Sequence, residues 1–116
     1  MSNFFKSSSR FKKTSRTDQY GIVLISGDPD KESSRYKNEI TTIMRYPQVV
    51  KSYSISTQQA MEWAPNLPLH KLPAFALIRE GIFGTQSLGH RLENAILCSD
   101  KLTEIIMYIE YLKEQD

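Results

Sequence analysis

Two acidic side chains that lie close together, Asp28 and Asp30, are the first residues of this chain whose types could do chemistry. If the fold brings His70 near them, the three side chains could bind a hard metal ion. Acidic residues also stabilise the first turn of a helix, because they lie at the positive end of its macrodipole. A helix is expected at this position, so we favour a capping role and expect neither a metal nor another cofactor.

The chain has a single cysteine, Cys98, which limits its thiol chemistry. One cysteine can form neither an intramolecular disulfide nor a cysteine-rich zinc site, and the sequence is consistent with a reducing, cytoplasmic location. The stretch AILCSD around it is largely apolar, which predicts a buried, inert thiol. No apolar run approaches the roughly 18 residues that a membrane span needs, and the N-terminal region lacks the apolar stretch of a signal peptide.

Positive charge is concentrated ahead of the first acid, Asp18. The five cations there are Lys6, Arg10, Lys12, Lys13 and Arg16. Removing these five from the 15 basic residues leaves ten against 13 acidic residues, so the rest of the chain is slightly acidic. Residues 1–17 are Ser-rich and unpatterned, which predicts a flexible basic arm followed by a domain at 18–116. The three Phe residues of the arm could dock on the domain, stack on bases or enter a membrane surface.

Behind the arm, hydrophobic patterning predicts alternating strands and helices. Four consecutive aliphatic residues in YGIVLIS (20–26) indicate a strand that is buried on both faces. The next helix should have Asp28 as its N-cap and Pro29 at its first position, and it should end at Pro47. A strand at 49–56, a short helix at 57–64 and a strand at 74–78 are expected to follow.

The last third of the chain predicts a hairpin and then a helix. Glu80 and Gly81 should form a tight turn that sends residues 82–88 back as an antiparallel strand. Ser99 or Asp100 should cap the final helix. The resulting order, βαβαββα, implies an α/β domain in which a four-stranded mixed sheet carries helices on both faces.

The chain resembles the thioredoxin fold family at two places as well as in this order of elements. After the first strand, thioredoxins carry Cys-Gly-Pro-Cys-Lys at the start of a helix, and this chain has GDPDK, with Pro29 and Lys31 at the positions of the family's proline and lysine. The family's Ile-Pro-Thr before an apolar strand is similar to LPAFALIREGIF, which begins at Leu72. The similarity covers roughly residues 19–115 and implies a thioredoxin-like fold.

The resemblance further implies a cis peptide bond between Leu72 and Pro73, which would face the first helix beside a groove. In family members this groove binds an extended peptide or glutathione. Gly27 and Asp30 stand where the family has its two cysteines, and neither can attack a disulfide, so the resemblance implies a redox-inactive member. The groove residues would be Gly27, Asp28, Pro29, Asp30, Lys31, His70, Leu72, Pro73, Gly89 and His90.

Three functions are compatible with these features. The first, which we favour, is a protein-binding or adaptor domain that uses the groove. The second is a polyanion binder whose arm contacts nucleic acid or an anionic membrane, although the slightly acidic body disfavours a broad nucleic-acid face. The third is an enzyme with glutathione-dependent or metal-assisted chemistry on the same fold, for which no convergent motif is present.

The last predicted helix has a second apolar face, formed by Met107, Tyr108 and Tyr111. Met107 and Tyr111 are four residues apart and therefore lie on the same side of the helix. If these side chains are exposed, they are a candidate interface for a partner protein or for a second copy in a homodimer. If the sheet covers them, they belong to the core.

Overall fold

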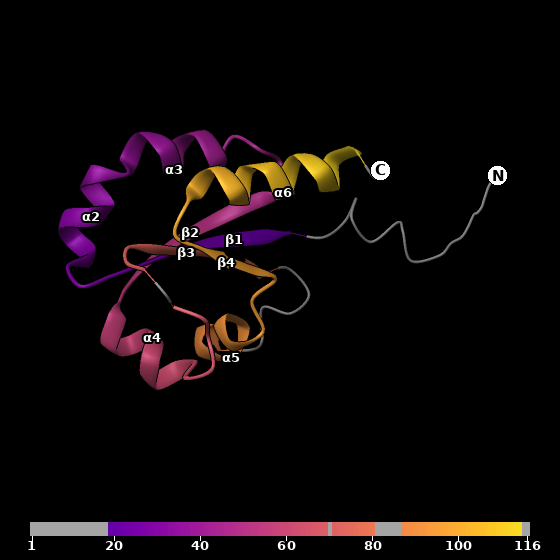
Figure 1. Cartoon of the computed structure of the whole chain (residues 1–116). Coiled ribbons are helices and arrows are strands. Elements are labelled where there is room, and N and C mark those ends of the chain that lie inside the picture. The colour runs from indigo at the N-terminus through magenta and orange to yellow at the C-terminus, as the bar shows by residue number, and fades with distance from the viewer. Residues whose placement is uncertain (1–18, 70, 81–86, 115–116) are drawn as a thin grey trace.

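The computed structural model describes residues 19–69, 71–80 and 87–114. Four strands in this part of the chain form one mixed sheet in the order β2-β1-β3-β4. The sheet lies between two helical layers, α2, α3 and α6 on one face and α4 and α5 on the other (Figure 1). The elements are β1 (Tyr20–Ser26), α2 (Pro29–Arg35), α3 (Lys37–Ile43), β2 (Val49–Ser56), α4 (Thr57–Trp63), β3 (Ala74–Arg79), α5 (Leu88–Glu93), β4 (Leu97–Ser99) and α6 (Leu102–Glu114).

Strand β1 is the centre of the molecule, and all seven of its residues are buried. It pairs in parallel with β2 and antiparallel with β3. Its alternate side chains feed two separate cores: Ile22 and Leu24 face the layer of α3 and α6, whereas Val23 and Ile25 face the layer of α4 and α5. The predicted doubly buried strand, four-stranded mixed sheet and helices on both faces are therefore confirmed.

The helix predicted after β1 begins as expected but is divided in two. Asp28 caps α2 by accepting a hydrogen bond from the backbone N–H of Lys31 at 3.3 Å, and Pro29 occupies the first turn. The division falls at Tyr36, which separates α2 from α3. The Tyr36 ring packs edge-on against Phe75 of β3, with ring centroids 5.4 Å apart. The junction between α2 and α3 is therefore packed against the core through Tyr36.

The predicted hairpin after β3 is contradicted at Leu88, and most of its returning strand, residues 82–86, lies outside the described residues. In the described structure β3 lies between β1 and β4 and pairs antiparallel with both, and helix α5 lies between β3 and β4 in the sequence. Leu88, expected at the end of a returning strand, is the first residue of α5, and Ser87 caps this helix by accepting a hydrogen bond from the N–H of His90. Residues 81–86, which include Gly81 of the predicted turn, lie outside the described residues.

Helix α6 begins at Leu102 and lies along the upper face of the sheet (Figure 1), so Lys101, and neither of the predicted residues Ser99 and Asp100, directly precedes its first turn. The Ser99 hydroxyl accepts a hydrogen bond from the N–H of Lys101 at 3.0 Å. Leu102, Ile105 and Ile109 are buried, as their spacing predicts for one face of a helix. The Tyr46 hydroxyl donates a hydrogen bond to the Glu110 carboxylate, which joins α6 to the turn before β2.

This Tyr46–Glu110 bond predicts a loss of stability at alkaline pH. It raises the pKa of Tyr46, with smaller contributions from desolvation and from the charge of Glu110. A raised folded-state pKa means that the stabilisation is complete below the unfolded pKa of about 10 and is lost as the pH rises through the folded-state value. The free energy of unfolding, measured in urea, should therefore fall more steeply above about pH 10 for the wild type than for Tyr46→Phe. Parallel curves would contradict this role.

Two further sequence expectations concern the chain as a whole. The proposed basic arm, residues 1–17, lies outside the described residues, as do its five cations. In the part of the chain that the structure describes, no helix combines the length and the apolar character needed to cross a bilayer.

Candidate functional site

The peptide bond between Leu72 and Pro73 is cis, as predicted. It lies at the carboxyl end of β1, because Ala74, the residue after the proline, pairs with Ile25. Helix α2 begins a few residues beyond Ile25 along β1. The topology therefore places the Leu72–Pro73 segment and the start of α2 at the same end of the sheet.

The GDPDK stretch forms the other side of this site, and its side chains have structural roles or point to solvent. Asp28 is occupied as the N-cap of α2, which confirms the capping interpretation for this residue. The Ser54 hydroxyl of β2 donates a hydrogen bond to the carbonyl oxygen of Pro29 at 3.2 Å and holds the first turn against the sheet. Asp30 and Lys31 are exposed.

No group of three potential metal ligands comes together among the described residues. His70, which was the third ligand of the metal alternative and also a predicted groove residue, lies outside those residues. Asp28 therefore has a capping role, and Asp30 lies exposed in the first turn of α2.

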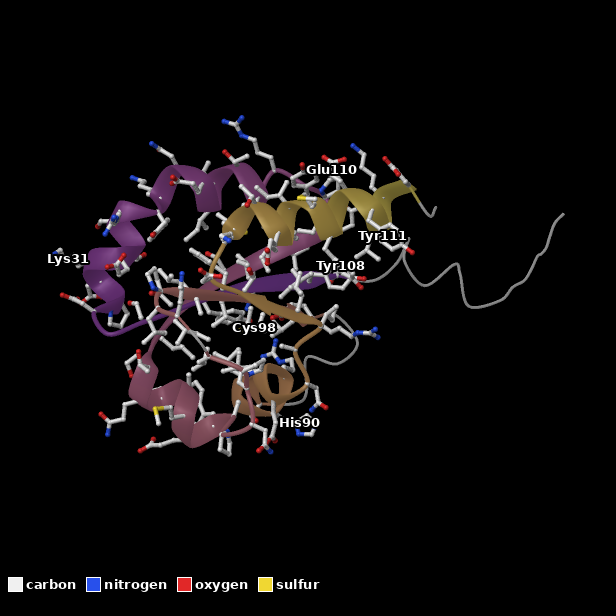
Figure 2. The ribbon with its side chains drawn as sticks, viewed as in Figure 1. Lys31, His90, Cys98, Tyr108, Glu110 and Tyr111 are labelled. Carbon is white, nitrogen blue, oxygen red and sulfur yellow. The ribbon has the colours of Figure 1, made fainter. Side chains whose placement is uncertain are left out.

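Gly89 and His90 were predicted to line the same groove, and the structure places them elsewhere. They lie in the first turn of α5, and Figure 2 shows His90 far from Lys31, on the opposite side of the sheet. A Cβ atom at Gly89 would come within 3.0 Å of the Trp63 side chain, so α5 packs closely on α4 at this point. The inserted helix is the reason that these two residues do not reach the groove.

An apolar pocket of about 370 Å³ adjoins the cis bond, and the sequence did not predict it. It runs between α4 and the segment that leads to Pro73. Two of its side chains are large, apolar and exposed: Leu72, at 48%, and Met61, at 62%. Thr57 also borders the pocket, and its hydroxyl oxygen is buried, with no hydrogen-bond partner among the described residues. The full lining is Thr57, Met61, Ala64, Pro65, Leu67, Leu69 and Leu72.

At the other end of β3, Glu80, which was predicted to form a tight turn with Gly81, belongs to a buried polar cluster. The Glu80 carboxylate accepts hydrogen bonds from the Tyr53 hydroxyl at 2.8 Å and from Arg91 Nη1 at 2.5 Å. The side chains of Arg91 and Glu80 are only 11% and 9% exposed. A Cβ atom at Gly21 would lie 2.8 Å from Glu80 Oε2, so glycine is what lets the carboxylate lie over β1. This cluster links α5 to β2 and to the residue that follows β3.

Cys98 is half-buried in β4, and the prediction of a fully buried thiol is therefore only partly right. Burial raises the pKa of the Cys98 thiol, which lowers the fraction of reactive thiolate at neutral pH. The residue borders a small pocket of about 140 Å³ with Lys71 and Ala74, and Figure 2 labels it beside β4. No second cysteine exists to resolve a mixed disulfide.

The candidate interface on α6 is partly exposed. Met107 is 70% exposed and Tyr111 is 55% exposed, whereas Tyr108 is half-buried and packs against the core. The rings of Tyr108 and Tyr111 lie 6.2 Å apart. Met107 and Tyr111 are therefore exposed, as a candidate interface requires, whereas Tyr108 is largely covered.

Comparisons of this chain with protein-family models, with curated proteins and with solved structures each returned no match.

Proposed function

We propose that this chain is a redox-inactive, thioredoxin-like domain that binds an extended segment of another protein. The observation that carries the proposal is the apolar pocket beside the cis bond, whose wall includes the exposed side chains of Met61 and Leu72. Exposed apolar surface grouped around a pocket is typical of sites where a partner binds. The cis Leu72–Pro73 bond and the adjacent start of α2 support the thioredoxin-like part of the proposal.

The binding mode follows from the two kinds of surface at this site. Leu72 lies just outside β3, and in this proposal its backbone would pair with the main chain of an extended segment. An apolar side chain of that segment would enter the pocket and contact Met61 and Leu72.

The electrostatics of the site favour an uncharged segment. The charged residues near the cis bond and the start of α2 are Asp28, Asp30, Lys31, Glu32 and Lys71, three acidic and two basic. Neither sign dominates, so the apolar contact and the backbone pairing, and not a salt bridge, would select the partner.

Displayed random peptides provide the probe for this proposal. Peptides that bind the full chain should share an apolar residue, and Met61→Ser or Leu72→Ser should weaken the best of them at least tenfold. Burial of an apolar side chain is worth about 1.5–3 kcal/mol, and tenfold in affinity corresponds to about 1.4 kcal/mol. The measurement is fluorescence polarisation of the labelled peptide.

Met107→Ser is the matched control, because Met107 is as exposed as Met61 but lies on α6, on the other face of the sheet. The control should bind the peptide with wild-type affinity. Equal affinities for Met61→Ser, Leu72→Ser and the wild type would rule out this groove as the binding site.

The redox part of the proposal has its own test. Gly27 and Asp30 offer no thiol at the start of α2, and Cys98 has a raised pKa and no resolving partner. The full chain should therefore reduce insulin disulfides with dithiothreitol no faster than dithiothreitol alone. A rate above this background that disappears in Cys98→Ser would show that the chain does carry out thiol chemistry.

A further inference from the structure

The exposed ridge on α6 has the chemistry of a docking surface for a cationic, aromatic segment. Met107 and Tyr111 lie one turn apart and expose most of their side chains. Their neighbours three residues away along the helix are Glu104, Glu110 and Glu114. Helix α6 carries these three acids against one basic residue, Lys113. A sulfur atom and an aromatic ring thus lie in an acidic surface.

We infer that the basic arm of the same chain, residues 1–17, binds this ridge. The arm has the complementary composition, since it contains five cations, three Phe residues and no acidic residue. Phe side chains pack favourably against methionine sulfur, and Arg and Lys side chains bind the face of a Tyr ring. Long-range attraction between the arm and the carboxylates of α6 would guide the contact.

The position at which the arm joins the domain makes this contact sterically simple. Tyr20, the first residue of β1, belongs to the core cluster against which Tyr108 and Leu112 of α6 pack. Figure 2 shows Tyr108 and Tyr111 on the side of α6 that faces the end of the sheet where β1 begins. Phe11 precedes Gln19 by eight residues, an extended reach of about 26 Å. The ridge from Met107 to Tyr111 spans only about 6 Å.

The same charges argue against a second copy of the chain as the occupant. A symmetric dimer through this ridge would bring two identical acidic surfaces together, with Glu114 exposed on each. Glu104 and Glu110 accept hydrogen bonds from Ser99 and Tyr46, but these bonds leave the negative charge in place. Like charges across an interface are destabilising, so the cationic arm is the better match.

Limited trypsin digestion of the full chain tests this inference, because its five basic residues give the arm several cleavage sites. At low salt, the cleavage of the arm should be at least about fivefold faster in Met107→Ser/Tyr111→Ser than in the wild type, as judged by mass spectrometry. Phe11→Ser should also accelerate cleavage. High salt should accelerate cleavage of the wild type, because it screens the attraction between the arm and α6.

Val50→Ser is the control here, since Val50 is an exposed apolar residue of β2 that belongs to neither the pocket nor the ridge. It should be cleaved at the wild-type rate. Equal cleavage rates in the wild type and in the α6 double variant would overturn the inference. A dimer, detected by sedimentation, that persists in Phe4→Ser/Phe5→Ser/Phe11→Ser but dissociates in the α6 double variant would also overturn it, and would assign the ridge to a second copy.

Discussion

Arg91→Met is expected to lower the free energy of unfolding by about 3–5 kcal/mol, the cost of breaking a buried ion pair from one side. The substitution leaves the Glu80 carboxylate almost fully buried, with the Tyr53 hydroxyl still bound to it. A typical domain is stable by only about 5–15 kcal/mol, so the loss would be a large part of the total. Urea denaturation followed by circular dichroism measures it.

Two further variants separate the ion pair from a general effect of losing arginine. Arg79→Met changes an exposed arginine at the end of β3 and should cost no more than about 1 kcal/mol. Glu80→Met/Arg91→Met removes both charges and should be more stable than Arg91→Met alone, because no unpaired charge remains buried. If Arg91→Met is no less stable than Arg79→Met, the cluster does not fasten α5 to the sheet.

Phe75→Ala is expected to cost about 3–5 kcal/mol, the usual range for removing a buried aromatic side chain. Phe75 is almost completely buried in the core beneath α3 and α6, and its ring packs edge-on against Tyr36. The substitution therefore removes both the apolar burial and the contact that supports the α2–α3 junction. The measurement is again the free energy of unfolding in urea.

Phe75→Leu is the matched variant, because it keeps an apolar side chain and loses only the aromatic contact. Its cost should be well below that of Phe75→Ala. A small effect of Phe75→Ala, comparable with that of Phe75→Leu, would mean that the core closes around the cavity and that the Tyr36 contact adds little.

The features that were predicted correctly depend on short-range patterns. Three elements could be predicted from residues that lie within or next to them. They are β1, from its run of aliphatic residues, α2, from its Asp28–Pro29 start, and α6, from its apolar spacing. Such local signals need no knowledge of the rest of the fold.

The features that were missed depend on residues that are distant in the sequence. Glu80 and Gly81 have the composition of an exposed turn, and the burial of Glu80 follows only from Tyr53 and Arg91, which come from other elements. Helix α5 has six residues and only Leu88 and Leu92 as an apolar pair, too few to establish a helical period. The resemblance placed Gly89 and His90 in the groove, whereas the structure has them in the first turn of α5.

The apolar pocket was missed for a similar reason. Met61 lies on α4 and Leu72 follows nine residues beyond the end of that helix, and nothing in either stretch indicates that they share a pocket. The sequence did indicate the cis bond, through the resemblance at LPAFALIREGIF, and so identified one wall of the site.

Site-specific photocrosslinking from position 72 tests the central claim most directly. A benzoylphenylalanine introduced at Leu72 of the full chain, and in parallel at Met107, would be irradiated in extract of the source cells. The account predicts that position 72 crosslinks to an extended segment of a discrete partner, that Met61→Ser weakens this crosslink, and that position 107 does not reach the same partner. Absence of any crosslink from position 72, or a crosslink that Met61→Ser leaves unchanged, would contradict a protein-binding groove beside the cis bond.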